Sequence, residues 1–397
     1  HLTAMRLLFV HDHKFFRVDE STYLSEGKIT DESFRRYDAI AKEINVLSRV
    51  RTGGDLRRHS RITHGTVSFS PVVGESFSSV ILRNWRINSR IVRDCLDQCD
   101  IAVLRLPSVL GSAVGLQLRL RRKPFVVELV GDPYEALAAS GSLSPLLASF
   151  LGASMARITR VLVARATGVI YVTKGALQSK FPANGFTVVA SNVNLDGLVQ
   201  VPRSAAARDA RGCFQFGLIG SYSNSYKGID FAIRALSRLQ RQHPNVALRI
   251  LGSGESRGLE ALARDLGVES KVLFEGVRRP GGELAAWLDS LDCYMQPSRT
   301  EGLPRATVEA MSRGLPCIGT SVGGLSELLE PSAAVMKDDE VGLASLMARV
   351  IEDGEFRAHL RQRSLDVASE FSADAIRGRL EGFWSSVRGV VRQVACS

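Results

Sequence analysis

The fold is constrained most by an alternation that runs the length of the chain, in which short apolar runs of strand length are followed by loops or amphipathic helical stretches. Such an alternation predicts parallel sheets covered by helices on both faces. In the first half, the predicted strands are residues 6–10, 101–104, 125–130 and 168–172. A polar loop is expected over residues 11–30 and a helix over residues 31–47.

The pattern starts again after a polar break at residues 202–212, which predicts a second domain. Residues 228–241 carry apolar side chains at helical spacing, and the alternation continues through residue 329. A chain of 397 residues is long enough for two domains. We therefore expect an α/β protein of two doubly wound, Rossmann-like domains that face a central cleft. The expected bounds are residues 5–200 and 206–375, followed by a helix at 376–397 that returns toward the first domain.

Charge is distributed unevenly between the two halves. Residues 1–200 carry 26 basic and 17 acidic side chains, whereas residues 201–397 carry 25 and 24. This surplus predicts either an anionic partner for the first half or an arginine-rich composition, since only nine of the 51 basic residues are lysines. No stretch interleaves basic with aromatic residues, so nucleic acid is not an expected partner.

Cysteine and hydropathy patterns predict a cytoplasmic protein. The six cysteines form no C-x-x-C pair, which favours a reducing compartment over a disulfide framework or a zinc site. No signal peptide and no apolar run as long as a spanning helix are recognisable. Residues 142–166 are first apolar and then basic. We interpret them as a core helix with an arginine-rich solvated face, and the alternative is a helix in peripheral contact with an anionic membrane at the inner face of the plasma membrane.

The densest chemical signal lies in residues 297–329. A loop follows a buried strand there, and a proline fits the first turn of the next helix, where its missing N–H costs nothing. The loop amides of Gly302 and Leu303 and the helix N-terminus then form an anion site. Glu301 lies in the loop and Glu309 in the second turn of the helix. One carboxylate can face a reacting group while the other accepts hydrogen bonds from a diol such as ribose.

These residues resemble the E-x7-E signature of retaining glycosyltransferases of the GT-B fold, specifically glycosyltransferase family 4. The matching residues are Pro297-Ser298, Glu301-Gly302-Leu303-Pro304, Glu309-Ala310-Met311, Gly314-Leu315-Pro316, Val322-Gly323-Gly324 and Glu327. Other loops that resemble the family are residues 217–220, Tyr226-Lys227-Gly228, Gly252-Ser253-Gly254 and Phe274-Glu275-Gly276-Val277. The resemblance covers essentially all of residues 212–330.

The resemblance implies a role for each matching side chain. Glu301 is expected near the transferred sugar and Glu309 on the ribose of the donor. Lys227 is expected to contact the donor diphosphate, and Val277 lies in the loop that holds the nucleobase through main-chain contacts. For Glu327 the residues themselves favour a structural role over a functional one, because it follows Gly323-Gly324 and fits a cap of the next helix.

One position departs from the family. An arginine usually follows the glycine that ends the first strand of the donor domain, whereas Ser221 follows Gly220 here. One of two phosphate-binding cations is therefore missing. Arg305, Arg299 or an arginine of the first domain is the candidate to replace it.

The first half resembles bacterial surface-polysaccharide glycosyltransferases more loosely, through residues 10–15, 128–133 and 171–173. Asp132 stands where many relatives carry a histidine near the transferred sugar, and it fits both a catalytic role and an N-cap for the next helix. His11 and His13 are expected to line a substrate pocket or to pack in the core rather than to bind a metal. Arg105 ends a strand at the cleft and is a candidate anion ligand.

The resemblance implies a retaining, metal-independent hexosyltransferase that needs no cofactor. Its partners would be a nucleotide-diphosphate sugar and a glycan or polyprenyl-diphosphate-linked acceptor in capsule, O-antigen or exopolysaccharide synthesis. Two alternatives are a degenerate nucleotide-sugar-binding protein of the same fold and a nucleotide-sugar epimerase. A nicotinamide-dependent dehydrogenase is not expected, because no G-x-G-x-x-G follows the first strand.

Overall fold

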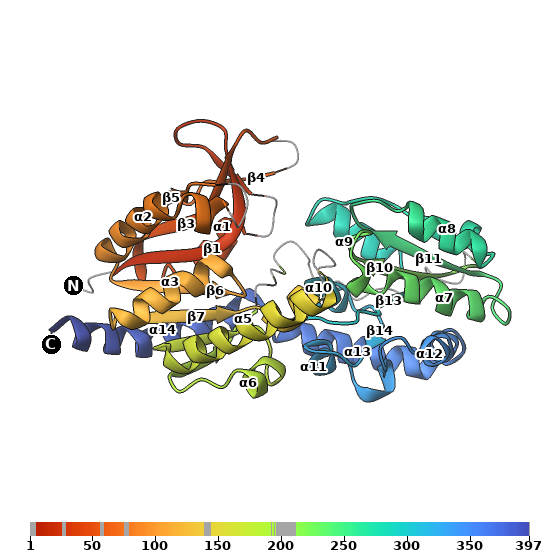
Figure 1. Ribbon diagram of the computed structural model, residues 1–397. Helices are drawn as coiled ribbons and strands as arrows, with labels where there is room; N and C mark the ends of the chain where they lie inside the picture. Colours follow the sequence, from red (N-terminus) through yellow and green to blue (C-terminus); the bar gives the residue numbers. More distant parts are fainter. Residues whose placement is uncertain are drawn as a thin grey trace.

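The computed structural model describes residues 5–25, 29–55, 59–74, 79–138, 144–191, 193, 195 and 212–396. Within these residues the chain forms two α/β units that lie side by side, each with its own sheet and with helices on both faces (Figure 1). The two-domain α/β architecture predicted from the alternation is confirmed. The polar break at 202–212 and the domain boundary at 200–206 lie outside the described residues, except for Gly212.

The first sheet has the strand order β4-β2-β1-β6-β7-β8-β9, with β3 paired to β1 and β5 paired to β3. Its pairs are parallel except for β1–β2 and β2–β4. The strands are β1 (Met5–Arg17), β2 (Tyr23–Ser25), β3 (Ala41–Thr52), β4 (Ser60–Ile62), β5 (Val67–Val72), β6 (Ile101–Leu106), β7 (Phe125–Leu129), β8 (Gly168–Tyr171) and β9 (Phe186–Val189). The helices of this unit are α1 (Asp31–Arg35), α2 (Trp85–Gln98), α3 (Val109–Leu120), α4 (Pro133–Ala138), α5 (Pro145–Arg165) and α6 (Ala176–Lys180).

Two expectations for this sheet are wrong. Residues 11–17 continue β1 instead of forming a loop, and residues 41–47, which were expected to belong to a helix, lie in β3. The polar string that follows Val10 conceals a period of two, in which His13 and Phe15 face inward while their neighbours remain partly exposed. The apolar residues of β3 are buried because the strand lies between β1 and β5. Pairing within the sheet overrides the helical spacing.

The second sheet has the order β12-β11-β10-β13-β14-β15, and every pair in it is parallel. Its strands are β10 (Phe214–Ile219), β11 (Val246–Leu251), β12 (Val272–Phe274), β13 (Cys293–Gln296), β14 (Cys317–Thr320) and β15 (Ala334–Val335). Its helices are α7 (Ile229–Leu239), α8 (Arg257–Asp265), α9 (Gly282–Asp289), α10 (Arg305–Ser312), α11 (Leu325–Leu328), α12 (Glu340–Glu352) and α13 (Gly354–Ser369). Loops at the carboxyl ends of these strands therefore gather at one edge, where ligands bind in such sheets.

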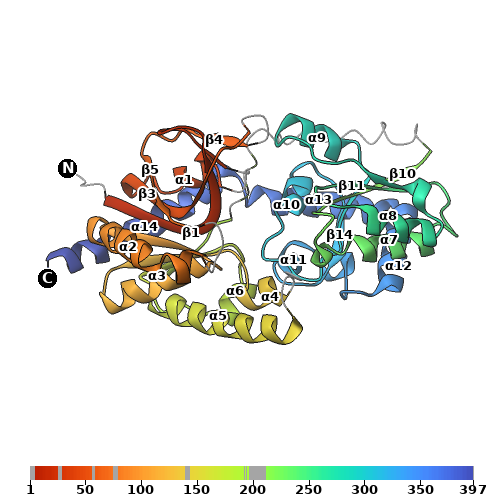
Figure 2. The same ribbon diagram turned by 45° about the horizontal axis from the view of Figure 1, so that its top comes forward.

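The last helix, α14 (Ala373–Cys396), leaves the second unit and packs along the first (Figure 2). Phe383 and Trp384 are buried in the same cluster as Phe9 and Tyr37. The indole N–H of Trp384 donates to the carbonyl oxygen of Arg36 at 3.1 Å. The C-terminal helix therefore returns to the first unit, so its packing holds the two units together in addition to the chain connection between them.

Helix α5 contradicts one expectation from the sequence. Its residues Leu146–Arg165 are long and apolar enough to cross a membrane by length and composition, although the core helix of a soluble protein passes the same test. Only 28% of the apolar window is buried inside the protein. Leu162 and Val163 join the core of the first unit, whereas Leu146 and Phe150 are exposed. One face of α5 thus remains uncovered by the described residues.

Replacing Trp384 tests whether α14 is part of the first unit. Trp384→Ala empties a fully buried site and should lower the free energy of unfolding by roughly 3–5 kcal/mol, whereas Trp384→Phe should cost less because most of the packing remains. Urea denaturation followed by circular dichroism measures both. The exposed Arg377→Ala on the same helix is the control and should change stability by less than about 0.5 kcal/mol. A wild-type midpoint for Trp384→Ala would contradict the packing described.

Candidate active site

The loop between β13 and α10 places Glu301 against Lys227. Lys227 ends η3 (Ser225–Lys227), a short turn of 3-10 helix that follows β10. Its Nζ lies 2.5 Å from Oε1 of Glu301, and the Ser298 hydroxyl donates to the same oxygen at 2.9 Å. Only 19% of the lysine side chain and 9% of the glutamate side chain are exposed. The pair is therefore largely buried, and the structure brings these two predicted site residues together.

Two glycines allow this approach. A Cβ on Gly220 would lie 3.0 Å from Cβ and Cγ of Lys227, so glycine leaves room for the lysine to cross the end of β10. Gly228 has a φ of 69°, which glycine adopts without strain. A Cβ there would also lie only 1.9 Å from the carbonyl oxygen of Pro297. The turn that carries Lys227 is thus fixed directly against the loop that carries Glu301.

Gly302 and Leu303 bring the same loop to the first unit. A Cβ on Gly302 would lie 2.5 Å from the carbonyl oxygen of Val130, and Leu303 packs against cores of both units. Among the residues that the structure describes, no acceptor takes the N–H of Gly302 or of Leu303. Both amides lie just before the first turn of α10 and can donate to an anion.

Glu309 lies on α10 with only 12% of its side chain exposed. Burial raises the pKa of its carboxyl, and the positive charge of Arg305 opposes that rise. The Arg305 guanidinium is 3.8 Å from the nearest carboxylate oxygen and 45% exposed. No donor in the described part of the chain hydrogen-bonds to the Glu309 carboxylate. Buried carboxylates normally have such partners, so this one can accept hydrogen bonds from the hydroxyl groups of a ligand.

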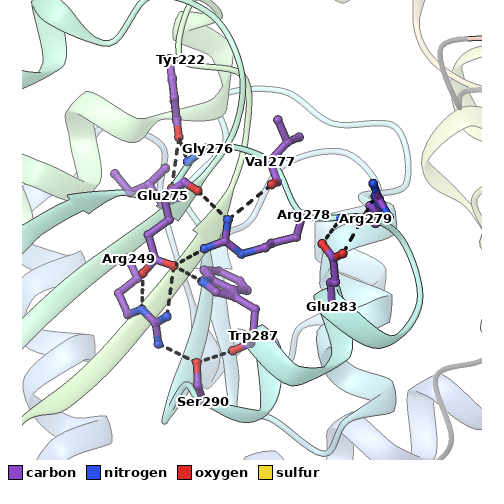
Figure 3. Close-up of polar contacts among 11 residues, drawn as sticks. Tyr222, Arg249, Glu275, Gly276, Val277, Arg278, Arg279, Glu283, Trp287 and Ser290 are labelled. Carbon is purple, nitrogen blue, oxygen red and sulfur yellow. Dashed lines mark hydrogen bonds and ion pairs between the residues drawn. The ribbon is translucent and has the colours of Figure 1, made fainter. Parts of the chain in front are cut away.

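A cluster of polar side chains around Glu275 anchors the loop that follows β12 (Figure 3). The N–H of Gly276 donates to the Tyr222 hydroxyl at 3.0 Å. Glu275 pairs with Arg249 at 2.5 Å, and although burial opposes ionisation, the hydrogen bond and charge of this arginine lower the pKa of Glu275. Val277, predicted to lie in the nucleobase loop, is 71% exposed and points away from the cluster. The loop is thus anchored on one side and open on the other.

The candidates for the missing phosphate cation differ in their surroundings. Arg299 is held by two carboxylates, Asp230 at 2.8 Å and Asp338 at 2.7 Å, so its charge is more than matched, whereas Lys227 has a single carboxylate partner. Arg305 has only the distant contact with Glu309. Ser221, at the position of the family's arginine, donates its hydroxyl to the Ser253 carbonyl at 3.2 Å. Arg305 therefore remains the candidate of the two.

In the first unit, Asp132 has a partner for each carboxylate oxygen. Oδ1 accepts the N–H of Tyr134 at 2.9 Å, which caps the first turn of α4. Oδ2 lies 2.9 Å from Nζ of Lys180. The N-cap interaction considered from the sequence is present. A catalytic role for Asp132 remains a prediction.

Each of the other candidates in the first unit has a hydrogen-bond or ion-pair partner within that unit. His11 donates through Nδ1 to the carbonyl oxygen of Arg105 at 3.1 Å, because a carbonyl can only accept. Burial and the Arg105 charge lower the pKa of His11 to about 3, so its ring is neutral. His13 bonds to the Ser25 hydroxyl, and the Arg105 guanidinium lies 3.2 Å from buried Glu128. Within the described residues, no group of three or more His, Cys, Asp or Glu side chains is placed to hold a metal ion.

The expectation that Glu327 caps its own helix is wrong. Its carboxylate instead accepts the N–H groups of Lys174, Gly175 and Ala176 at the start of α6 in the first unit. The Thr300 hydroxyl likewise donates to Glu135 of the first unit. Sequence reasoning missed both contacts because each joins residues more than 150 positions apart, and no local pattern marks such a pair.

Several known proteins are similar to this chain in sequence or in fold. A family model described as glycosyl transferases group 1 matches residues 213–353. Protein CapJ of Staphylococcus aureus is 30% identical over 354 residues, which cover 89% of this chain and 88% of that protein. The putative colanic acid biosynthesis glycosyltransferase WcaL of Salmonella typhimurium is 30% identical over 173 residues, 41% of this chain and 42% of that protein. The crystal structure of HepE from Anabaena in complex with UDP has a TM-score of 0.70 at 19% identity, covering 96% of this chain and 100% of that one.

The chain therefore belongs to the group 1 glycosyltransferases, with the GT-B fold that its resemblance to family 4 implied. It is a glycosyltransferase of bacterial polysaccharide biosynthesis. The matched region holds the loops that carry Lys227, Val277, Glu301 and Glu309, which places the donor-site candidates in the part of the chain that defines the family.

The surroundings of Glu309 predict a pH-dependent contribution to stability. A carboxyl whose pKa is raised by folding binds its proton more tightly in the folded chain. Its contribution to stability is therefore lost as pH rises above the ordinary value of 4.5. Glu309→Gln cannot ionise, so its unfolding free energy relative to wild type should increase from pH 4.5 toward pH 7, measured by urea denaturation across that range.

Glu330→Gln supplies a control of opposite sign. Hydrogen bonding by Ser332 and the nearby His359 lower the pKa of Glu330, so the stability it contributes is present above the ordinary value and is lost in acid. Its glutamine variant should lose stability relative to wild type as pH rises. If both variants follow the same trend with pH, the account given for Glu309 is wrong.

Proposed function

We propose that this glycosyltransferase retains the anomeric configuration and needs no metal ion. It moves a hexose-type sugar from a nucleotide-diphosphate sugar to a hydroxyl of a glycan or lipid-linked acceptor. The observation that carries the proposal is Glu309, a buried carboxylate to which no donor among the described residues hydrogen-bonds, on the helix that follows the loop of Glu301. A ribose would supply the missing hydrogen bonds, and the diphosphate would then lie toward the lysine.

The donor class is supported by structural neighbours. HepE from Anabaena has been solved in complex with UDP and with UDP-glucose, and it shares the fold over 96% of this chain. A nucleoside diphosphate is therefore the ligand to test first. The main chain around Gly276 and Val277 is the proposed nucleobase contact, because the polar cluster beneath holds that loop in place.

Transfer in this proposal occurs on one face of the sugar. The bond from the anomeric carbon to the phosphate oxygen breaks while the acceptor oxygen bonds to the same carbon from the same side, and the acceptor proton passes to the departing phosphate oxygen. Lys227 and the amides of Gly302 and Leu303 stabilise the charge that develops on the diphosphate. These groups supply the positive charge for which other transferases use a metal ion.

Glu301 would orient the sugar. Its Oε1 is taken by Lys227 and Ser298, whereas Oε2 contacts no donor among the described residues. The second oxygen can therefore accept a hydroxyl of the transferred sugar. The ion pair holds the carboxylate in place for that contact.

A thermal-shift panel tests the donor site. UDP, GDP, ADP and dTDP are added to the wild-type chain with and without a chelator, and one of them should raise the melting temperature equally in both conditions. Binding only the folded state at 100 times Kd adds about 2.7 kcal/mol. Glu309→Ala should lose the shift, and the control Glu330→Ala, altered on the same unit, should keep it. A shift that needs metal, or none with any diphosphate, refutes the proposal.

We also propose that the enzyme acts in the cytoplasm, in peripheral contact with the inner face of the plasma membrane, on a polyprenyl-diphosphate-linked acceptor. Leu146 and Phe150 of α5 are 87% and 69% exposed, and Leu147 and Leu151 beside them are partly exposed. Arg157 continues this face, and α5 contains no acidic residue. Apolar side chains next to arginines fit the boundary of an anionic bilayer.

Vesicle sedimentation tests this contact. The wild-type chain should bind vesicles that contain phosphatidylglycerol more strongly than vesicles of phosphatidylcholine alone. The double variant Leu146→Glu and Phe150→Glu should reduce the binding constant at least about tenfold, since each side chain removed from the apolar boundary is worth about 1.5–3 kcal/mol. Leu273→Glu, an exposed leucine of the second unit, is the matched control and should bind as wild type. Equal binding by the double variant would remove α5 from the contact.

A further inference from the structure

Glu327 of the second unit joins the two units through hydrogen bonds to three consecutive main-chain N–H groups of the first unit. Its Oε2 accepts the N–H of Lys174 at 2.5 Å, and its Oε1 accepts those of Gly175 and Ala176 at 2.8 and 2.7 Å. Hydrogen bonds that involve an ionised acceptor are about twice as strong as neutral ones. Three of them from consecutive backbone groups fix both the position and the orientation of α6 relative to α11.

The segment that carries Glu327 also supports the predicted sugar site. Gly323 and Gly324 immediately precede α11, and a Cβ on either would lie 1.9 Å from the carbonyl oxygen of Glu301 or Gly302 respectively. The N–H of Gly324 donates to the Glu301 carbonyl at 3.4 Å. A movement of α11 therefore cannot leave the Glu301 loop where it is.

The other end of α6 reaches the same loop through the first unit. Lys180, the last residue of α6, binds Asp132 at 2.9 Å and Glu135 at 2.5 Å. Glu135 in turn accepts the hydroxyl of Thr300, the residue before Glu301. A second ion pair, between Lys174 and Glu370 at 2.5 Å, flanks the Glu327 contact. Helix α6 is thus fastened to the second unit at its start and indirectly at its end.

We propose that Glu327 is a positioning residue that latches the first unit onto the second in the arrangement required for transfer. It touches neither Lys227 nor Glu309, so it acts through α6 and the Glu301 loop. The latch rests on the glycosyltransferase activity of the chain but not on which sugar or nucleotide is used. Its loss should impair transfer while leaving nucleotide binding, which involves the second unit alone, intact.

The chemistry of the contact requires a carboxylate of this length. A glutamine offers one acceptor oxygen and turns an NH₂ group toward N–H donors, so it can keep only part of the latch. An alanine leaves three backbone N–H groups without their acceptor at the interface. Glu330, three residues further on, binds Ser332 and His359 of its own unit and makes a matched control.

The test compares Glu327→Ala, Glu327→Gln and Glu330→Ala with wild type in the full chain. Hydrogen exchange of the amides of residues 174–176 should accelerate at least about tenfold in Glu327→Ala, because these N–H groups lose their acceptor. Small-angle X-ray scattering should show a larger radius of gyration for this variant. Glu327→Gln should lie between it and wild type, and Glu330→Ala should match wild type in both measurements.

Function supplies the second readout. With the donor selected by the diphosphate panel, Glu327→Ala should reduce kcat at least about tenfold, since small misplacements of reacting groups cost that much or more. Its Kd for UDP or for the diphosphate that binds should stay within about twofold of wild type. Unchanged exchange and scattering would overturn the latch even if no donor were found. A parallel loss of diphosphate affinity would overturn it by showing that Glu327 belongs to the donor site.

Discussion

Backbone packed directly on backbone around the loop from Pro297 to Leu303 is the constraint on which the site depends. Three carbonyl groups of this loop lie only 1.9 Å from where a Cβ would stand on Gly228, Gly323 or Gly324. On a further side, Gly302 meets the carbonyl of Val130. Because main-chain atoms hold the loop from several directions, Glu301 is presented with little freedom. A methyl group at any of these glycines must displace the loop.

The two carboxylates of the cleft differ in their surroundings and so in what they can do. Glu301 has a cation and a hydroxyl on one oxygen, and these two contacts hold its carboxylate in one orientation. Glu309 is buried with only a distant guanidinium, and its pKa is raised. Burying a carboxylate without hydrogen-bond donors costs free energy. A ligand hydroxyl that donates to Glu309 removes that cost, and this adds to the free energy of binding.

The sequence allowed the elements of the second unit to be predicted in detail, because local signals are strong there. Strands buried on both faces appear as apolar runs, and the proximity of Lys227 to Glu301 follows from neighbouring strands ending at one edge. The roles of these site residues remain predictions. Prediction failed for residues 11–17 and 41–47, where strand pairing overrides local spacing. It also failed for Glu327, because a carboxylate that bonds the backbone of a distant helix leaves no trace in the neighbouring residues.

The proposed donor contacts and the contacts that join the two units come from different parts of the structure. The side chains proposed to hold the donor lie in the second unit, whereas Glu327 and Thr300 cross to the start of α6 and to α4 in the first unit. The proposed donor contacts and the contacts between the units therefore involve different residues, although both sets include or adjoin the loop that carries Glu301. The hydrogen bonds of Glu327 go to main-chain N–H groups of residues 174–176 and so do not depend on which side chains those residues carry. Such contacts tolerate side-chain substitution, because backbone N–H groups persist whichever side chains change.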